Sequence, residues 1–116
     1  MSQHHLLLVL TNPVDGREDE YNDWYTHRHL PDVLTIPGVI AAQRFALSGK
    51  QRMRAPYPWR YLAIYEIETD DLDIVIKALH ERSGGRTMPL TSALHEERVS
   101  WFFQPVTERM EVNATV

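Results

Sequence analysis

The order of strand-like and helix-like segments is the feature that most constrains the fold of this chain. Four apolar segments have the composition of β-strands, at residues 5–11, 39–48, 59–69 and 98–104. Two segments have helical periodicity, one beginning near Arg17 and one at about residues 70–82. The resulting order, β-α-β-β-α-β, predicts an α+β, ferredoxin-like fold, in which a four-stranded antiparallel sheet carries both helices on one face.

The strand segments are apolar on both faces, whereas two helices can cover only one. Adjacent residues of a strand point to opposite sides, and the pairs Leu7 and Leu8, Ile64 and Tyr65, and Phe102 and Phe103 are all apolar. A monomer rarely exposes an apolar patch of that size. We therefore expect a homodimer in which two sheets pack face to face.

The first helix is predicted to present an aromatic face. Positions i, i+3, i+4 and i+7 share one side of a helix, and here they are Tyr21, Trp24, Tyr25 and Arg28. Pro31 disfavours helical geometry at Leu30, so we expect the helix to kink or end there. Further along, residues 91–96 are predicted to form a short extra helix and residues 106–116 a C-terminal tail.

Length and composition exclude several classes of protein. The 116 residues predict a single domain spanning 1–116, and the absence of cysteine excludes disulfides, thiolate metal sites and cysteine nucleophiles. A net charge of -4 argues against a nucleic-acid partner. The apolar run Leu6 to Leu10 is too short to span a membrane, and nothing near the start resembles a cleavable signal. We expect a cytoplasmic protein with no membrane partner.

His29 is the first candidate for catalysis. It stands at the expected kink, and histidine can act as general base or acid near neutral pH. The alternative is that His29 only fixes the kink through a hydrogen bond. Asp32 is a candidate to orient His29, or else to cap the turn at Val33. No metal site is expected, because His27 and His29 diverge on a helix and no other histidine pair has ligand spacing.

Arg44 is the third candidate catalytic residue. A charge on a strand that is buried on both faces needs a partner or an anionic ligand. The alternative is an ion pair with Glu66 on a neighbouring strand.

Six aromatic residues are candidates to bind a substrate: Tyr21, Trp24, Tyr25, Phe45, Tyr61 and Tyr65. Core packing is the alternative for the helical aromatics, and the dimer core is the alternative for the two tyrosines of the third strand. The basic loop at residues 49–58 is a candidate to close over an acidic substrate, or else a solvated mobile loop.

The stretch from Asn12 to Phe45 resembles a known family. The motifs that carry the resemblance are Asn12-Pro13, Gly16, Glu20, Tyr21, Trp24, Tyr25, His29-Leu30-Pro31-Asp32, Pro37-Gly38, Ala42-Gln43-Arg44-Phe45 and, in the third strand, Tyr61 to Glu66. They are similar to the EthD-like group of the dimeric α/β-barrel superfamily. The resemblance implies a pocket between the sheet and the first helix, with His29 at its edge. Relatives on this scaffold include cofactor-free monooxygenases, polyketide cyclases, lactone isomerases and haem-dependent enzymes, so the resemblance does not choose the reaction.

Two hypotheses for the function follow. The first is a cofactor-independent enzyme (isomerase, lyase, cyclase or monooxygenase type) acting on a small aromatic or lactone-like metabolite in aromatic catabolism. His29 would move a proton, Asp32 or Glu20 would hold it, and Arg44 or Tyr65 would stabilise an oxyanion.

The second hypothesis is a non-catalytic dimeric module that binds a small molecule or a partner protein. No cofactor is expected, and haem with a histidine as its axial ligand is the remaining option. A pocket that solvent can reach and that touches His29 favours the enzyme, whereas a cavity filled by Trp24 and Tyr65 favours the binding module.

Overall fold

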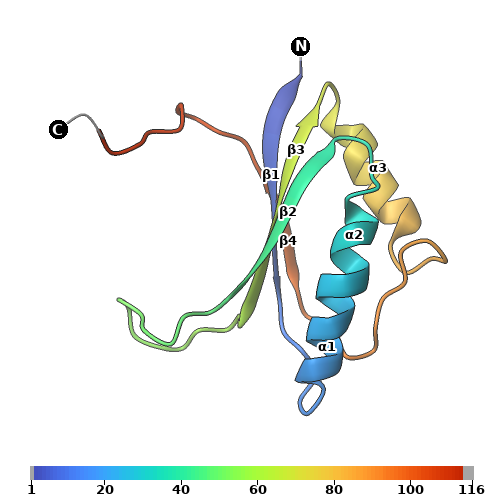
Figure 1. Ribbon diagram of the computed structural model, residues 1–116, viewed down its shortest axis with the longest axis vertical. Helices are drawn as coiled ribbons and strands as arrows, with labels where there is room; N and C mark the ends of the chain where they lie inside the picture. Colours follow the sequence, from blue (N-terminus) through green and yellow to red (C-terminus); the bar gives the residue numbers. More distant parts are fainter. Residues whose placement is uncertain (1, 114–116) are drawn as a thin grey trace.

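The predicted ferredoxin-like α+β fold is confirmed by a computed structural model that describes residues 2–113. Its elements are β1 (Gln3–Thr11), α1 (Glu18–Trp24), the π-helix η1 (Tyr25–His29), α2 (Leu30–Val33), β2 (Val39–Ala46), β3 (Tyr61–Thr69), α3 (Leu72–Arg82) and β4 (Val99–Phe103). The strands form an antiparallel sheet in the order β2-β3-β1-β4. Figure 1 shows the helices packed on one side of this sheet. The last three residues of the predicted tail lie outside the described residues.

The helical segment from Glu18 to Val33 is continuous, so the expected end of the helix at Leu30 is wrong, whereas the expected kink stays a prediction. The chain widens instead into a π-helical turn, in which the Leu30 N–H donates to the Tyr25 carbonyl five residues back. A proline ring clashes with the carbonyl four residues before it, and for Pro31 that carbonyl belongs to His27. The wider turn lets the helix continue past the proline.

The π turn also changes which side chains face the sheet. A regular helix would turn Arg28 inward with Tyr21 and Tyr25. The wider turn adds one residue to the repeat, so that Arg28 is exposed and His29 points inward. The prediction of one helical face was therefore correct for Tyr21 and Tyr25, but the last residue of that face is His29 and not Arg28.

The core lies between the helices and one face of the sheet. Leu7 in the central strand pairs with Tyr65 of β3 and Phe102 of β4, and all three face the helices. A β-bulge between Val39 and Ala41 puts Val39 on the same side, whereas the sequence pattern placed these two residues together on one face. In one copy of the chain only this helix-covered face is well buried.

Residues 83–98 form an irregular strap along the edge of the helical layer. The helix expected at residues 91–96 does not form, because backbone bonds tie this segment to the turn after β1 instead. The Val14 N–H donates to the Ala93 carbonyl at 2.7 Å, and the His95 N–H donates to the Asn12 carbonyl at 2.9 Å. Within the strap, the side chains of Met88 and Ala93 are buried.

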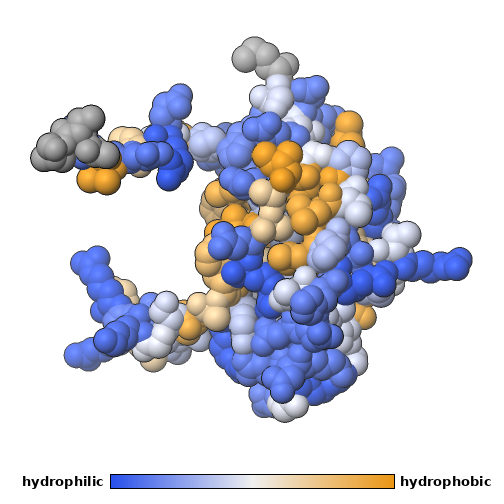
Figure 2. Space-filling model, in the orientation of Figure 1, coloured by the Kyte–Doolittle hydropathy of each residue, from blue (hydrophilic) through white to orange (hydrophobic). Residues whose placement is uncertain are grey.

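Two arms extend from the sheet on the side opposite the helices (Figure 1): the hairpin arm, residues 47–60, and the tail arm, residues 104–113. Figure 2 shows apolar surface along the side of the sheet between them. Within residues 2–113, no helix is long and apolar enough to cross a membrane.

Gly38 closes the turn between α2 and β2, and its substitution should destabilise the fold. Its φ of +99° is strained for other residues, and an added Cβ would lie 3.0 Å from Val75 Cγ2 and 3.3 Å from the Glu68 carbonyl. We expect Gly38→Ala to lower the free energy of unfolding by about 2 kcal/mol in urea titrations. Gly16→Ala, with φ of +80° and no atom within 4 Å, should cost about 1 kcal/mol. Equal decreases in unfolding free energy for Gly38→Ala and Gly16→Ala would show that the contact with Val75 does not contribute.

Candidate functional site

A cavity of about 520 Å³ lies between the helix-covered face of the sheet, the π turn, α3 and the strap. Its walls are mainly apolar, with Leu7, Val9, Val33, Ile76, Leu79, Met88, Leu90, Leu94 and Phe102. The polar or aromatic residues that reach it are Thr11, Trp24, Tyr25, His29, Tyr65, His80, Ser83, Arg98 and Ser100. An apolar pocket of this size with a few polar groups is typical of a site for a small molecule.

Aromatic rings fix the position of His29 in the wall of this cavity. The indole of Trp24 stacks on the imidazole with ring centroids 4.6 Å apart and planes 25° apart. The ring of Tyr25 meets the imidazole edge-on, at 5.1 Å and 89°. Trp24 is itself held by the strap, because its Nε1 donates to the Pro89 carbonyl at 3.0 Å. The π turn makes this contact possible by placing residues five apart, Trp24 and His29, side by side.

His29 is neutral at physiological pH because its pKa is lowered. Burial lowers its pKa from 6.5 to about 4, while the negative charge of Asp32 raises the pKa and the positive charge of Arg98 lowers it further. Its Nδ1 atom is buried and has no hydrogen-bond partner among residues 2–113. A neutral imidazole with a free nitrogen can take a proton or accept a hydrogen bond from a ligand.

Asp32 lies near His29 but does not hold it by a hydrogen bond. Its carboxylate accepts a bond of 2.7 Å from Arg28 Nε. Asp32 is also inside α2, whose N-cap is His29, so the alternative that Asp32 caps this turn is wrong. The alternative that His29 fixes a kink by hydrogen bonding finds no support, because its Nδ1 is unpaired.

Two tyrosine hydroxyls supply hydrogen-bond donors on the same cavity wall. Burial raises the pKa of Tyr65 well above its usual value, and the neighbouring Tyr25 hydroxyl adds to the effect. Burial likewise raises the pKa of Tyr25, to about 12. The Tyr65 hydroxyl is buried and has no partner with hydrogen-bond geometry in the described part of the chain. Both phenols therefore stay protonated at neutral pH and can donate to a ligand oxygen.

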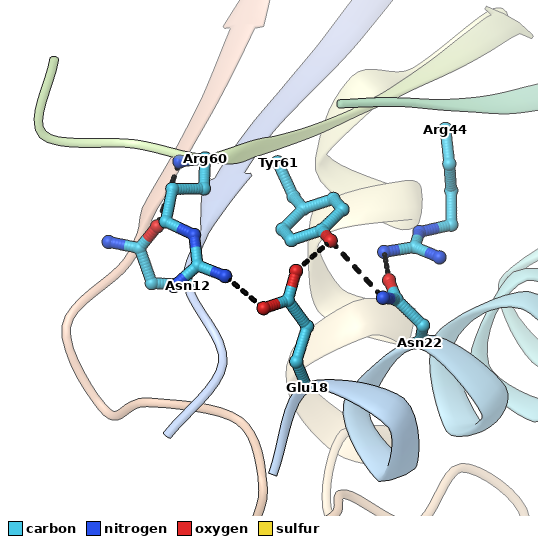
Figure 3. A network of polar contacts seen from close by, with 6 residues as sticks. All are labelled: Asn12, Glu18, Asn22, Arg44, Arg60 and Tyr61. Carbon is cyan, nitrogen blue, oxygen red and sulfur yellow. Dashed lines mark hydrogen bonds and ion pairs between the residues drawn. The ribbon is translucent and has the colours of Figure 1, made fainter. Parts of the chain in front are cut away.

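Arg44 belongs to a separate polar network, drawn in Figure 3. Its guanidinium donates to Asn22 Oδ1 at 2.9 Å and to Thr26 Oγ1 at 2.8 Å. It also lies 4.5 Å from the centroid of the Tyr25 ring and slightly further from two other tyrosine rings. An ion pair with Glu66 is not formed, because the strand register puts the two side chains on opposite faces of the sheet.

Tyr61 and Tyr21 also lie outside the cavity. The Tyr61 hydroxyl donates to Glu18, which is ion-paired with Arg60 (Figure 3), and Asn22 Nδ2 donates to the same hydroxyl at 3.2 Å. Tyr21 is fully buried, and its hydroxyl bonds to Thr11 Oγ1. These contacts join α1 to the sheet. Tyr61 and Tyr65 both face the helices, so neither can form a core between two sheets.

Phe45 and Glu20 do not line the cavity that His29 reaches. Phe45 is 40% exposed on the other face of the sheet, beside a shallow groove of about 340 Å³ that Leu6 and Ile64 also line. Glu20 pairs with Arg17 at the surface. Of the nine predicted site residues, the fold brings Trp24, Tyr25, His29 and Tyr65 to one cavity, and their roles there stay predictions.

Sequence reasoning missed the walls contributed by α3 and β4. Ile76, Leu79, His80 and Ser83 have the spacing of one helical face, and Arg98, Ser100 and Phe102 alternate along a strand. The sequence contains both of these spacings. It does not show that the two faces they define lie beside His29 in the fold. No group of three or more potential metal-ligating side chains was found among residues 2–113.

Comparisons with solved structures define the class of fold. The chain is similar to a NIPSNAP family protein from Agrobacterium tumefaciens (TM-score 0.62, 12% identity, covering 92% of this chain and 90% of that one). It is also similar to an ethyl tert-butyl ether d (EthD) family protein from Bacillus halodurans (TM-score 0.58, 15% identity, covering 89% and 98%). An EthD-like protein from Ralstonia eutropha matches with a TM-score of 0.58 and 16% identity, covering 92% and 96%. The fold is therefore that of the dimeric α/β-barrel proteins, as the resemblance implied.

Comparisons of sequence add one relative. A segment of 65 residues is 35% identical to core atranone cluster (CAC) protein 1 from the fungus Stachybotrys chlorohalonatus. That segment covers 54% of this chain, and the match spans only 26% of the relative's length. No protein-family model matches the chain.

The low pKa of His29 predicts a specific dependence of stability on pH. The unfolded chain takes up a proton at this histidine below about pH 6.5, and the folded chain only near the pKa of about 4. Stability should therefore fall as pH falls through this interval. Between about pH 7 and pH 4.5, the wild type should lose about 2 kcal/mol more unfolding free energy than His29→Gln in urea titrations. His27→Gln, on the exposed side of the same turn, should keep the wild-type slope, and an unchanged slope in His29→Gln would contradict the burial of a neutral imidazole.

Proposed function

We propose that the protein is a cofactor-independent enzyme that moves a proton on a small aromatic or lactone-like metabolite. His29 is the general base, and the Tyr65 hydroxyl stabilises the oxygen that gains negative charge. The observation that carries the proposal is a cavity, open to solvent, whose wall includes His29 and Tyr65. Each of these residues has a buried polar atom with no hydrogen-bond partner among residues 2–113. A buried polar atom without a partner costs about 1–3 kcal/mol, which a ligand that satisfies it recovers.

The reaction that fits these groups is removal of a proton from a carbon next to a carbonyl. The neutral imidazole of His29 takes the proton, and the electron pair moves onto the carbonyl oxygen to give an enolate. Tyr65, and Tyr25 beside it, donate hydrogen bonds to that oxygen. Return of the proton to a different atom completes an isomerisation, and departure of a leaving group completes an elimination. Neither outcome requires a cofactor.

A binding module without catalysis is less consistent with this site. Trp24 and Tyr65 form walls of the cavity rather than filling it. His29, held between two aromatic rings in the cavity wall, supplies a titratable group that binding of an apolar ligand alone would not need. The similarity to a core atranone cluster protein and to EthD-like proteins also supports processing of a small molecule. We propose that residues 1–116 act as one domain in the cytoplasm.

Exchange of hydrogen for deuterium tests the proton transfer without knowledge of the natural substrate. The probe is benzofuran-2-one, an aromatic lactone with acidic hydrogens next to its carbonyl, followed by NMR in D₂O. The wild type should accelerate the exchange, and His29→Gln should reduce the acceleration by about 100-fold or more. Tyr65→Phe, which removes only the hydroxyl, should reduce it by about 10-fold or more. His27→Gln is the matched control. Acceleration that persists in His29→Gln would remove this histidine from the mechanism.

We also propose that the protein is a homodimer in which two copies cover each other's open sheet faces. Trp101 and Phe103 of β4 are 56% and 50% exposed there. The chain exposes 8650 Å², about 2000 Å² more than expected for a compact monomer of 13.5 kDa. Its radius of gyration is 16.0 Å, compared with about 13 Å expected for this length. The two arms account for the extended shape and lie on the side where a second copy would sit (Figure 1).

Sedimentation tests the dimer. The wild type should sediment as a dimer at micromolar concentration, and Trp101→Glu should shift it to monomer because a charge cannot be buried between two apolar sheets without a partner. Ile74→Glu is the matched control, because Ile74 is 60% exposed on α3, away from the open face. A monomeric wild type would contradict the dimer.

A further inference from the structure

Arg98 stands at the solvent-exposed rim of the cavity, directly before β4. It alternates with Ser100 and Phe102, and all three line the cavity wall. Arg98 is the only arginine or lysine among the residues that line this cavity, and no aspartate or glutamate lines it within the described range 2–113. The cavity therefore has a positive charge at its mouth and no negative charge to balance it.

Arg98 makes no polar bond that would explain its position. It forms no hydrogen bond and no ion pair with any residue between 2 and 113. Arg17, Arg28, Arg60 and Arg109 each pair with a carboxylate. Arg98 differs from the other unpaired arginines within residues 2–113, which are Arg52, Arg54, Arg82 and Arg86, because it lines the cavity. The chain has 16 acidic residues against 12 basic ones, yet none of those carboxylates is bonded to Arg98.

The positive charge of Arg98 affects the pKa values of His29 and Tyr25, two residues with proposed roles in the reaction. Burial is the main cause of the lowered pKa of His29, the charge of Asp32 opposes this effect, and the charge of Arg98 lowers the pKa further. Its positive charge also opposes the increase that burial causes in the pKa of Tyr25. Arg98 is thus electrostatically close to both groups, while its own side chain remains accessible to solvent.

We propose that Arg98 binds a carboxylate of the substrate, so that the site selects small apolar aromatic acids over neutral compounds of the same shape. This proposal rests on the function proposed above and names its substrate class. The apolar body of the acid fills the space between Leu7, Leu79 and Phe102, and the carboxylate lies at the mouth. The carbon that loses its proton then faces His29, deeper in the cavity.

A carboxylate fits this arrangement for two reasons. The guanidinium has parallel N–H donors whose spacing matches the two oxygens of a carboxylate, so that one arginine can hold it in a fixed orientation. The rest of the cavity wall is mainly apolar and holds no other arginine or lysine, which disfavours ligands that carry several negative charges. The carboxylate would also fix the position of the reacting carbon relative to His29, which is how an anchor distant from the chemistry contributes to the rate.

A pair of probes that differ only in charge tests the proposal. They are 2-naphthoate and 2-naphthamide, with affinities measured by isothermal titration calorimetry on the full chain. The wild type should bind the acid at least about 10-fold more tightly than the amide. Arg98→Met should remove this preference by weakening the acid about 10-fold and leaving the amide unchanged. Arg86→Met, which removes an exposed arginine of the strap that does not line the cavity, should retain the preference.

The outcomes separate this proposal from the proposed function. Equal affinity of the wild type for acid and amide, or equal weakening of both by Arg98→Met, would overturn the role of Arg98 while leaving the cavity as a binding site. Failure of both probes to bind the wild type would overturn the site itself and the inference with it. Thermal unfolding of Arg98→Met, expected to match the wild type because the side chain is exposed, excludes a loss of fold as the cause.

Discussion

The candidate site depends on one extra residue in a helical turn. Pro31 cannot donate a backbone hydrogen bond and would clash with the carbonyl four residues before it in a regular helix. The chain resolves this conflict through the π turn from Tyr25 to His29. The same turn brings His29 against Trp24 and points it into the cavity. A backbone constraint from a single proline thereby determines which side chain becomes the candidate base.

An unpartnered imidazole nitrogen and an unpartnered phenol lower the stability of the chain that contains them, so other contacts must offset them. The network around Arg44 is one such source. Its guanidinium holds Asn22 and Thr26 of the helical segment and lies over the rings of three tyrosines, while Glu18 accepts from Tyr61 and pairs with Arg60 (Figure 3). These contacts attach the first helix to β2 and β3 without using the Nδ1 atom of His29 or the hydroxyl of Tyr65. Arg44 is therefore better described as a structural residue that fixes the first helix against the sheet.

The fold could be predicted from the sequence because it follows from local periods and their order. Strand and helix periodicity are properties of neighbouring residues, and β-α-β-β-α-β is compatible with few topologies. The site could be predicted only where it lies in the first helix. The register beyond Tyr25 could not, because the position of a π turn depends on how a helix accommodates Pro31 against a packed sheet. Phe45 was misplaced relative to His29 for a different reason: a strand pattern shows which residues share a face but not which face the helices cover. The role proposed for Arg98 could not be predicted from the sequence either, since Arg98 meets the first helix only when β4 pairs beside β1.

The central position of β1 has a further consequence for how the molecule works. Odd-numbered residues of this strand, such as Leu7 and Val9, line the cavity, and Leu6, on the opposite face, lines the shallow groove of the open face. One sheet thus separates two surfaces, one that we propose binds the ligand and one that we propose packs against the second copy. Binding and association can then be altered independently by substitutions on the two faces, although both depend on the same strand being in register.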